Sequence, residues 1–130
     1  MAKRRLTLHV RIPPYRAKRN AWRRKLHSAI STARRTRRVE YTPNDMLQLD
    51  IRLYIAGNAL RFHDVDNRLK DVMDALQGRA GGPKGRQALR PIIHNDQQVY
   101  RVVMEKAPPP SQSRGFGHLT VRKLRRPKWA

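Results

Sequence analysis

Apolar and polar residues alternate strictly from Met46 to Ile55, and this pattern is the strongest constraint on the fold. A period of two is that of a β-strand with one face against a core. Arg5 to Ile12 alternates in the same way and stops at Pro13-Pro14, because proline lacks the backbone donor that a strand ladder needs. The side chains expected to point inward are Leu6, Leu8, Val10 and Ile12 in the first strand and Leu47, Leu49, Ile51, Leu53 and Ile55 in the second, with Gln48, Asp50, Arg52 and Tyr54 pointing outward.

Helical spacing follows each of these two strands. Apolar residues at Trp22, Leu26, Ala29, Ile30 and Ala33 predict an amphipathic helix after a basic loop, Tyr15 to Asn20. Leu69, Val72, Met73 and Leu76 lie at i, i+3, i+4 and i+7 and predict a second helix. We expect this helix to begin near Asp66 or Asn67 and to end at Gly78, which suits the left-handed turn after a helix.

Two further strands are expected, from Gln98 to Met104 and from Gly117 to Leu124. Residues 78 to 91 contain four Gly and two Pro, which predicts a mobile loop. The order strand, helix, strand, helix, strand, strand predicts a single α/β domain over residues 1–130, with a basic tail from about residue 125. Its sheet is small and mixed, with two main helices covering one face.

Charge is strongly unbalanced, with 30 Lys and Arg against nine acids and a formal net charge of +21. Residues 1 to 39 hold fourteen of the bases and no acid. This predicts a polyanionic partner, and the predominance of Arg favours nucleic acid over a membrane. A genome rich in G and C is the alternative source of Arg. The candidate DNA-binding residues are Arg23, Arg24, Arg34 and Arg35 on the solvent side of the first helix, Arg61 and Arg68 beside the second, and Lys84 and Arg86 in the loop.

Composition also excludes several classes of protein. The absence of cysteine rules out disulfides and zinc-thiolate sites. No run approaches the roughly 20 apolar residues of a membrane span, and the N-terminus lacks the apolar run of a signal peptide. We therefore expect a cytoplasmic protein with no membrane partner and no small-molecule substrate.

Four of the nine acids, Asp64, Asp66, Asp71 and Asp74, fall within eleven positions. Asp and Asn are favoured at helix starts, so capping alone is one interpretation of Asp64 to Asn67. A cap needs only one carboxylate, however, and two at i and i+2 on an extended approach can converge on one cation. An oxygen-rich ligand set without Cys suits Mg²⁺ or Mn²⁺.

Two further residues support a metal site. Asp66, Lys70 and Asp74 form a stripe along one edge of the helix, so Lys70 is placed to touch a phosphate held by the metal. The apolar run Ile92-Ile93 leads to Asp96, which we expect to join Asp64 and Asp66 as a third carboxylate. Such a site allows metal-dependent hydrolysis of a phosphodiester. His63 and His94 are expected to serve packing or to orient groups at the site.

These residues resemble the RusA family of Holliday-junction resolvases. The resemblance covers most of the chain from Leu6 to about Val121. It rests on Asp64-Val65-Asp66-Asn67, Lys70, Asp74-Ala75-Leu76, and Asn95-Asp96 followed by Val99, and more weakly on Ile12-Pro13-Pro14. It implies that Asp64, Asp66 and Asp96 bind catalytic Mg²⁺ or Mn²⁺ and that Lys70 is needed for cleavage. It also implies a homodimer that binds four-way DNA junctions and nicks two strands symmetrically, in recombination and repair.

This sequence departs from the family pattern at two places. Asn95 stands where the family commonly has a second acid, which predicts weaker metal binding. Tyr15-Arg16 replaces the usual Ser-x-Asn after the two prolines, so no role is carried over to that loop. We expect Asp74 and Asn95 to lie around the ligands, with Asp74 orienting Lys70 or a metal-bound water. Phe62 and Phe116 are candidates for stacking at the junction centre, although an isolated Phe more often belongs to a core.

Two other functions fit the same sequence. One is a non-catalytic basic nucleic-acid-binding protein, in which the aspartates only cap a helix. The other is a nuclease that prefers flaps or forks to four-way junctions.

Overall fold

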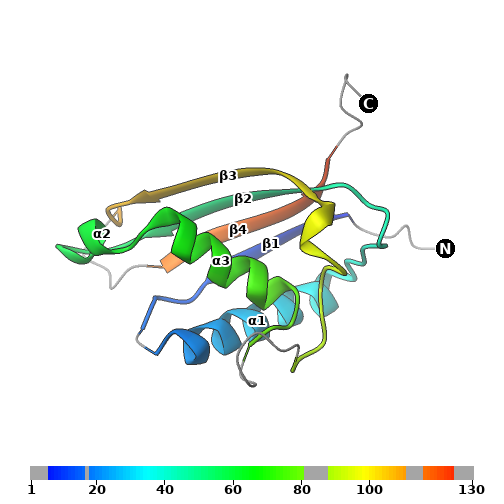
Figure 1. Cartoon of the computed structure of the whole chain (residues 1–130), viewed down its shortest axis with the longest axis horizontal. Helices are drawn as coiled ribbons and strands as arrows, with labels where there is room; N and C mark the ends of the chain where they lie inside the picture. The colour runs from blue at the N-terminus through cyan, green and yellow to red at the C-terminus, as the bar shows by residue number, and fades with distance from the viewer. Residues whose placement is uncertain (1–5, 17, 81–87, 111–115, 125–130) are drawn as a thin grey trace.

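The computed structural model describes residues 6–16, 18–80, 88–110 and 116–124, without the side chains of Ala59 and Phe62. Its strands form one four-stranded mixed sheet in the order β1-β4-β2-β3. All the labelled helices lie on one side of this sheet (Figure 1). The strands are β1 (Thr7–Ile12), β2 (Leu47–Tyr54), β3 (Val99–Ala107) and β4 (Phe116–Lys123), and the helices are α1 (Arg19–Arg37), α2 (Ala59–Phe62), α3 (Val65–Leu76) and the 3-10 helix η1 (Asp96–Gln98). The predicted α/β fold is thus confirmed.

The direction of the strands decides which loops meet. β4 lies between β1 and β2 and is antiparallel to both, whereas β2 and β3 are parallel. Parallel neighbours require a crossover, and α3 provides it. The start of α3 therefore follows the end of β2, and the start of β3 lies back at the opposite end of the sheet.

The core fills the space between the sheet and its helices. Every inward residue predicted for β2 is buried, together with Trp22, Leu26 and Ile30 of α1 and Val72 and Leu76 of α3. Burying one such side chain contributes about 1.5 to 3 kcal/mol. The indole of Trp22 also donates a 3.1 Å hydrogen bond to the carbonyl of Pro13, which fixes the chain between β1 and α1.

One local prediction was wrong. Gln48 was expected to point to solvent; it lies on the outward face of β2 and donates to Asp50 over 3.0 Å, but it is only 4% exposed. His27 on α1 is also buried, and its Nε2 donates to the carbonyl of Arg90 over 2.7 Å. α1 continues through Arg37 and closes at Arg38 in the left-handed region, so Arg34 and Arg35 belong to the helix.

Lys84, Arg86, the middle half of the predicted mobile loop and the basic tail lie outside the described residues. Within the described ranges, no helix has the length and apolar character needed to cross a membrane.

Candidate active site

Asp64 and Asp66 lie at the start of α3, where the chain arrives from α2. Asp64 is the last extended residue before the helix, and its side chain accepts no capping bond from the helix backbone. Its Oδ2 accepts from the side-chain amide of Asn67 instead, over 3.3 Å. Both carboxylates are exposed. A capping hydrogen bond therefore does not account for Asp64, while Asp66 lies in the first turn of the helix.

Lys70 is exposed one helical turn after Asp66 on the same side of α3. Within the described part of the chain, neither Lys70 nor Asp66 has an ion-pair partner. Asp74 was expected to orient Lys70 or a metal-bound water. Its Oδ2 is 3.0 Å from Nη1 of Arg23 on α1, so the ion pair of Asp74 is with the neighbouring helix and not with Lys70.

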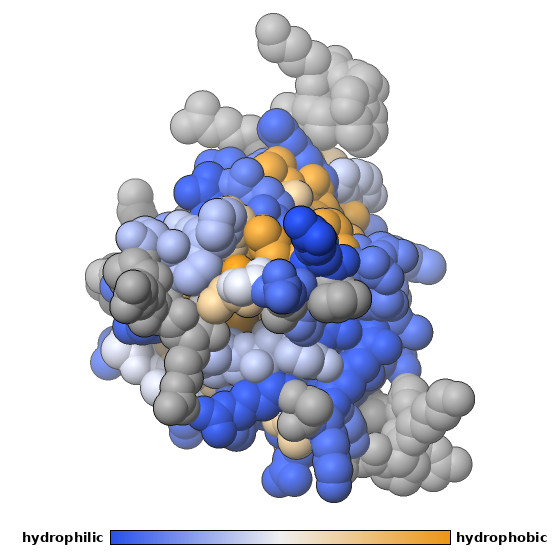
Figure 2. Space-filling model, turned by 90° about the vertical axis from the view of Figure 1, so that its left-hand side faces the viewer, coloured by the Kyte–Doolittle hydropathy of each residue, from blue (hydrophilic) through white to orange (hydrophobic). Residues whose placement is uncertain are grey.

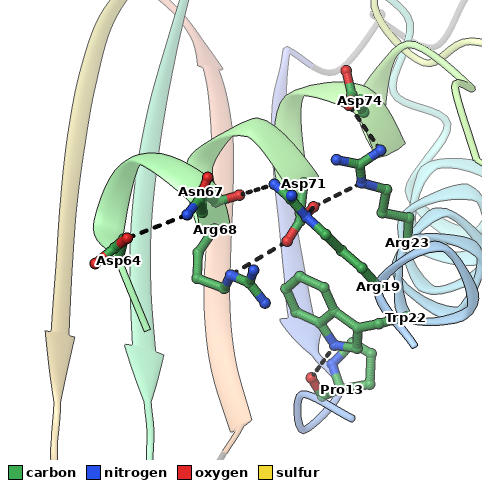
Figure 3. A network of polar contacts seen from close by, with 9 residues as sticks. All are labelled: Pro13, Arg19, Trp22, Arg23, Asp64, Asn67, Arg68, Asp71 and Asp74. Carbon is green, nitrogen blue, oxygen red and sulfur yellow. Dashed lines mark hydrogen bonds and ion pairs between the residues drawn. The ribbon is translucent and has the colours of Figure 1, made fainter. Parts of the chain in front are cut away.

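Asp71 is the buried acid of this cluster. It is fully buried, and its Oδ1 accepts from Nε of Arg19 over 2.6 Å and from Nε of Arg23 over 2.7 Å. Its Oδ2 is 3.3 Å from Nε of Arg68. Figure 3 shows these arginines converging on Asp71 from α1 and from α3 itself. One carboxylate with three guanidiniums ties the two helices together.

Arg68 was expected to bind phosphate at the surface, but it is buried. Its guanidinium lies 4.2 Å from the centre of the Tyr15 ring, and its Nη1 has no hydrogen-bond partner. Arg23 was likewise expected on the solvent side, yet it is held by Asp71 and Asp74. Both arginines support the position of α3 and are not available to DNA in this conformation.

Asp96 does not join Asp64 and Asp66 within one chain. It opens η1 directly before β3. Lys106, near the other end of β3, donates to the carbonyls of Leu60 and His63 beside Asp64. The nine residues of β3 extend for about 26 Å, so the predicted three-carboxylate group is not formed. The described residues contain no group of three or more His, Asp or Glu that could share a metal ion.

Asn95 has a structural role. Its side chain accepts from the backbone N–H of Gln97 over 2.7 Å and caps η1, with Gln98 completing a capping box. Asn95 was expected to lie around the metal ligands, but within one chain it does not lie beside Asp64 and Asp66. His94 donates from Nε2 to the carbonyl of Tyr41 over 3.0 Å, which is a packing contact.

His63 packs edge-on against the Tyr15 ring, with 4.7 Å between ring centres. Burial lowers the pKa of His63, and the neighbouring charges of Arg68 and Lys106 lower it further. Both effects disfavour the protonated form of the imidazole.

A basic groove runs along the outer side of α1. It is a cavity of about 430 Å³ lined by Arg24, His27, Ser28, Ser31, Arg34, Arg35, Leu89 and Arg90. Four arginines, two hydroxyls and no acid make it suitable for phosphates. Of the predicted DNA-binding residues, Arg24, Arg34 and Arg35 thus come together, while Arg61 is exposed separately on α2.

The ion pair between Arg19 of α1 and Asp71 of α3 was not predicted from the sequence. Arg19 and Arg23 are spaced i, i+4 on α1, which places both on one face. Arg68 and Asp71 are spaced i, i+3 on α3, beside its apolar stripe. These two pairs of charged residues, one on each helix, were the only sign in the sequence of an ion pair between the helices.

Comparison of the sequence with protein-family models and with curated proteins finds no match to either.

Proposed function

We propose that the protein is a metal-dependent endonuclease of the RusA type, which resolves four-way DNA junctions by paired symmetric nicks in recombination and repair. One observation carries this proposal. Asp71 and Asp74 are occupied by arginines of α1, whereas Asp64, Asp66 and Lys70 stay exposed together at the start of α3. An acidic pair beside a lysine, left open in a chain of net charge +21, suits a cation and a phosphate.

Asp64 and Asp66 fit Mg²⁺, with Mn²⁺ as a substitute. Mg²⁺ is usually bound by one or two carboxylates, several waters and the oxygens of a substrate phosphate, and this donor set matches an exposed pair without a third acid. When bound, the metal supplies Lewis-acid stabilisation of the phosphate and lowers the pKa of a bound water.

Lys70 contributes a fixed positive charge one turn from Asp66. Its ammonium binds a non-bridging or leaving oxygen of the scissile phosphate and offsets the charge that grows there. His63 packs against Tyr15 beside Asp64 and supports the chain at the site.

Asp96 enters this site through a second subunit. One chain separates it from Asp64 and Asp66 by the length of β3, so a homodimer is the arrangement in which all three act on one metal. A two-fold dimer also presents two equivalent sites to a nearly two-fold junction. The exposed large apolar side chains of the described residues are Val65, Tyr100, Val102 and Val103, of which three lie on the edge strand β3. Figure 2 shows an apolar area amid the hydrophilic surface at the α2 end of the molecule, and such a patch favours association.

The basic groove of α1 serves a DNA arm at a distance from the metal. Arg19 of α1 donates to the carbonyl of Asn67 over 3.1 Å, so this end of α1 lies beside the start of α3. Ser28 to Arg35 follow along α1 by about 14 to 24 Å at 1.5 Å per residue. Contacts of this kind position the duplex and carry no base sequence, as recognition of a branched shape requires.

The test compares cleavage of a synthetic four-way junction, a flap and a fork with Mg²⁺, using Asp66→Asn as control. Faster cleavage of the junction, at symmetric positions on two strands, supports the proposal. Equal rates on all three substrates would favour a flap or fork nuclease. Binding without cleavage, with either Mg²⁺ or Mn²⁺, would favour the non-catalytic binding protein.

Mixing two inactive variants tests the shared site. A dimer formed from one Asp66→Asn chain and one Asp96→Asn chain keeps one intact site if Asp96 is supplied by the partner, so mixing restores nicking of one strand. If both residues act within one chain, each site of the mixed dimer carries a defect and no nicking returns. Each variant alone is the matched control.

A further inference from the structure

The face of the sheet opposite α1 and α3 carries no helix among the described residues (Figure 1). At the end where β2 runs into α2, this face is aromatic. Tyr54 and Phe116 are directly paired across β2 and β4, and their ring centres are 4.9 Å apart. The His118 ring is perpendicular to Phe116 at 5.3 Å and to Tyr54 at 5.9 Å.

Two arginines, Arg11 and Arg52, flank these rings, and Arg122 lies on the same face farther along β4. The guanidinium of Arg11 on β1 lies 4.7 Å from the centre of Phe116. Arg52 is paired with His118 across the strands and lies two residues from Tyr54 on the same face. The side chains of Arg52 and Arg122 are 53% and 50% exposed. The acids of this face, Asp50 and Glu105, are each engaged by one of these two arginines.

A core function does not account for this cluster. The buried core lies on the other face, with the inward residues of β2 and the apolar residues of α1 and α3. Tyr54 and Phe116 are half-buried, and His118 is exposed. β1, β2 and β4 therefore together place aromatic and cationic side chains on a surface that the helices leave open.

We propose that this sheet face binds single-stranded nucleic acid, with unpaired bases stacking on Phe116, Tyr54 and His118. Stacking on aromatic rings tolerates any base, and flanking arginines bind the phosphates. A four-stranded sheet with aromatic side chains on its open face is a known platform for unpaired bases. A duplex is disfavoured as the occupant, because its bases are stacked on one another and do not offer their faces.

The position of this surface suits the proposed function, although binding of a single strand to it does not depend on cleavage. Tyr54 ends β2, and Asp64 begins α3 after the short α2, so the aromatic cluster and the acidic pair lie at the same end of the sheet on opposite sides of it. A strand that leaves a branch point can contact the rings while the neighbouring duplex reaches Asp64.

The test is binding of a fluorescent oligothymidylate and of a duplex of equal length, in EDTA so that the cleavage proposal is not involved. Phe116→Leu keeps an apolar side chain and removes the ring, and Arg11→Gln removes one cation from the cluster. Arg37→Gln is the matched control, because it removes the same charge from an exposed position of α1 that does not line the groove. Loss of one stacked base predicts about a fivefold or larger loss of affinity for the single strand with Phe116→Leu.

The expected pattern is that Phe116→Leu and Arg11→Gln weaken single-strand binding, that Arg37→Gln changes it less than twofold, and that Phe116→Leu leaves duplex binding unchanged. The aromatic NMR signals of Tyr54, Phe116 and His118 in the unaltered protein should shift when the oligonucleotide is added. This measurement tests the proposal even if a variant fails to fold. Equal losses on single strand and duplex, unshifted ring signals, or loss of a dimer with Phe116→Leu would overturn the proposal. The last of these would assign the face to a second copy of the chain.

Discussion

The Nε of Arg23 donates to Oδ1 of Asp71 over 2.7 Å, across the interface between α1 and α3. Because Asp71 is fully buried, this bond links the basic helix to the helix that carries Asp64 and Asp66. The same arginine reaches Asp74, so one side chain of α1 fixes two turns of α3. The orientation of the candidate site thus depends on residues that do not take part in its chemistry.

Replacing Asp71 with Asn should destabilise the protein by about 3 to 5 kcal/mol, because buried Arg68 loses its counter-charge. Chemical denaturation measures the change. Glu105→Gln is the matched control, since its partner Arg52 is in solvent and exposed ion pairs contribute little. Equal effects of the two variants would contradict a structural role for the Asp71 network.

Gly78 follows α3 with φ +75°, and a Cβ there would lie 2.2 Å from the carbonyl oxygen of Leu89. Gly78→Ala should therefore cost clearly more than the roughly 1 to 2 kcal/mol of a left-handed alanine. Gly57 has φ +61° with open space around it, so Gly57→Ala measures the backbone cost alone. The difference between their free energies of unfolding isolates the contact with Leu89.

Tyr41 lies in the core and donates its hydroxyl hydrogen toward the carbonyls of Leu6 and Val121. Burial raises the pKa of Tyr41 well above its ordinary value of 10.0, and Asp45 raises it further. The unfolded chain therefore loses this proton first, so the contribution of Tyr41 to stability is complete below pH 10 and falls as the pH rises above it. Tyr41→Phe should flatten the fall in the free energy of unfolding above about pH 10, and an unchanged slope would contradict this.

The groove of α1 is tested by the salt dependence of junction binding. Arg24→Gln with Arg35→Gln should weaken binding and reduce the slope of log K against log salt by about 0.9 for each phosphate that is no longer neutralised. The cleavage rate at saturating protein should stay the same, because these arginines are remote from Asp66. An unchanged slope would remove the groove from the DNA interface.

The strands and helices were predictable because one face of each is buried. The alternation from Met46 to Ile55 fixed both the strand and its inward side, and the spacing from Leu69 to Leu76 fixed the apolar face of α3. Gln48 keeps the outward direction that the alternation predicts, but it is buried and its amide donates to Asp50. Period alone does not show which polar side chains are satisfied inside the protein.

The roles of the acids in the cluster were only partly predictable. Asp71 and Asp74 belong to the interface with α1, and tertiary ion pairs of this kind leave only weak traces in one sequence. The grouping of Asp96 with Asp64 failed for a reason that the element order contained. In a strand, helix, strand unit with parallel strands, the helix returns the chain to the end of the sheet where the first strand began. Within one subunit, Asp96 and Asp64 therefore lie at opposite ends of the sheet.

The most direct test of the central claim is single-turnover cleavage of a four-way junction with Mg²⁺, by the unaltered protein and by Asp66→Asn. Asp66 is exposed and has no ion-pair partner among the described residues, so the variant should fold and bind the junction as before. We predict that the unaltered protein nicks two strands symmetrically and that Asp66→Asn cuts at least about 100-fold more slowly, as expected when a group that stabilises the transition state is removed. Cleavage by Asp66→Asn at the unaltered rate, or no cleavage by either protein, would contradict the claim.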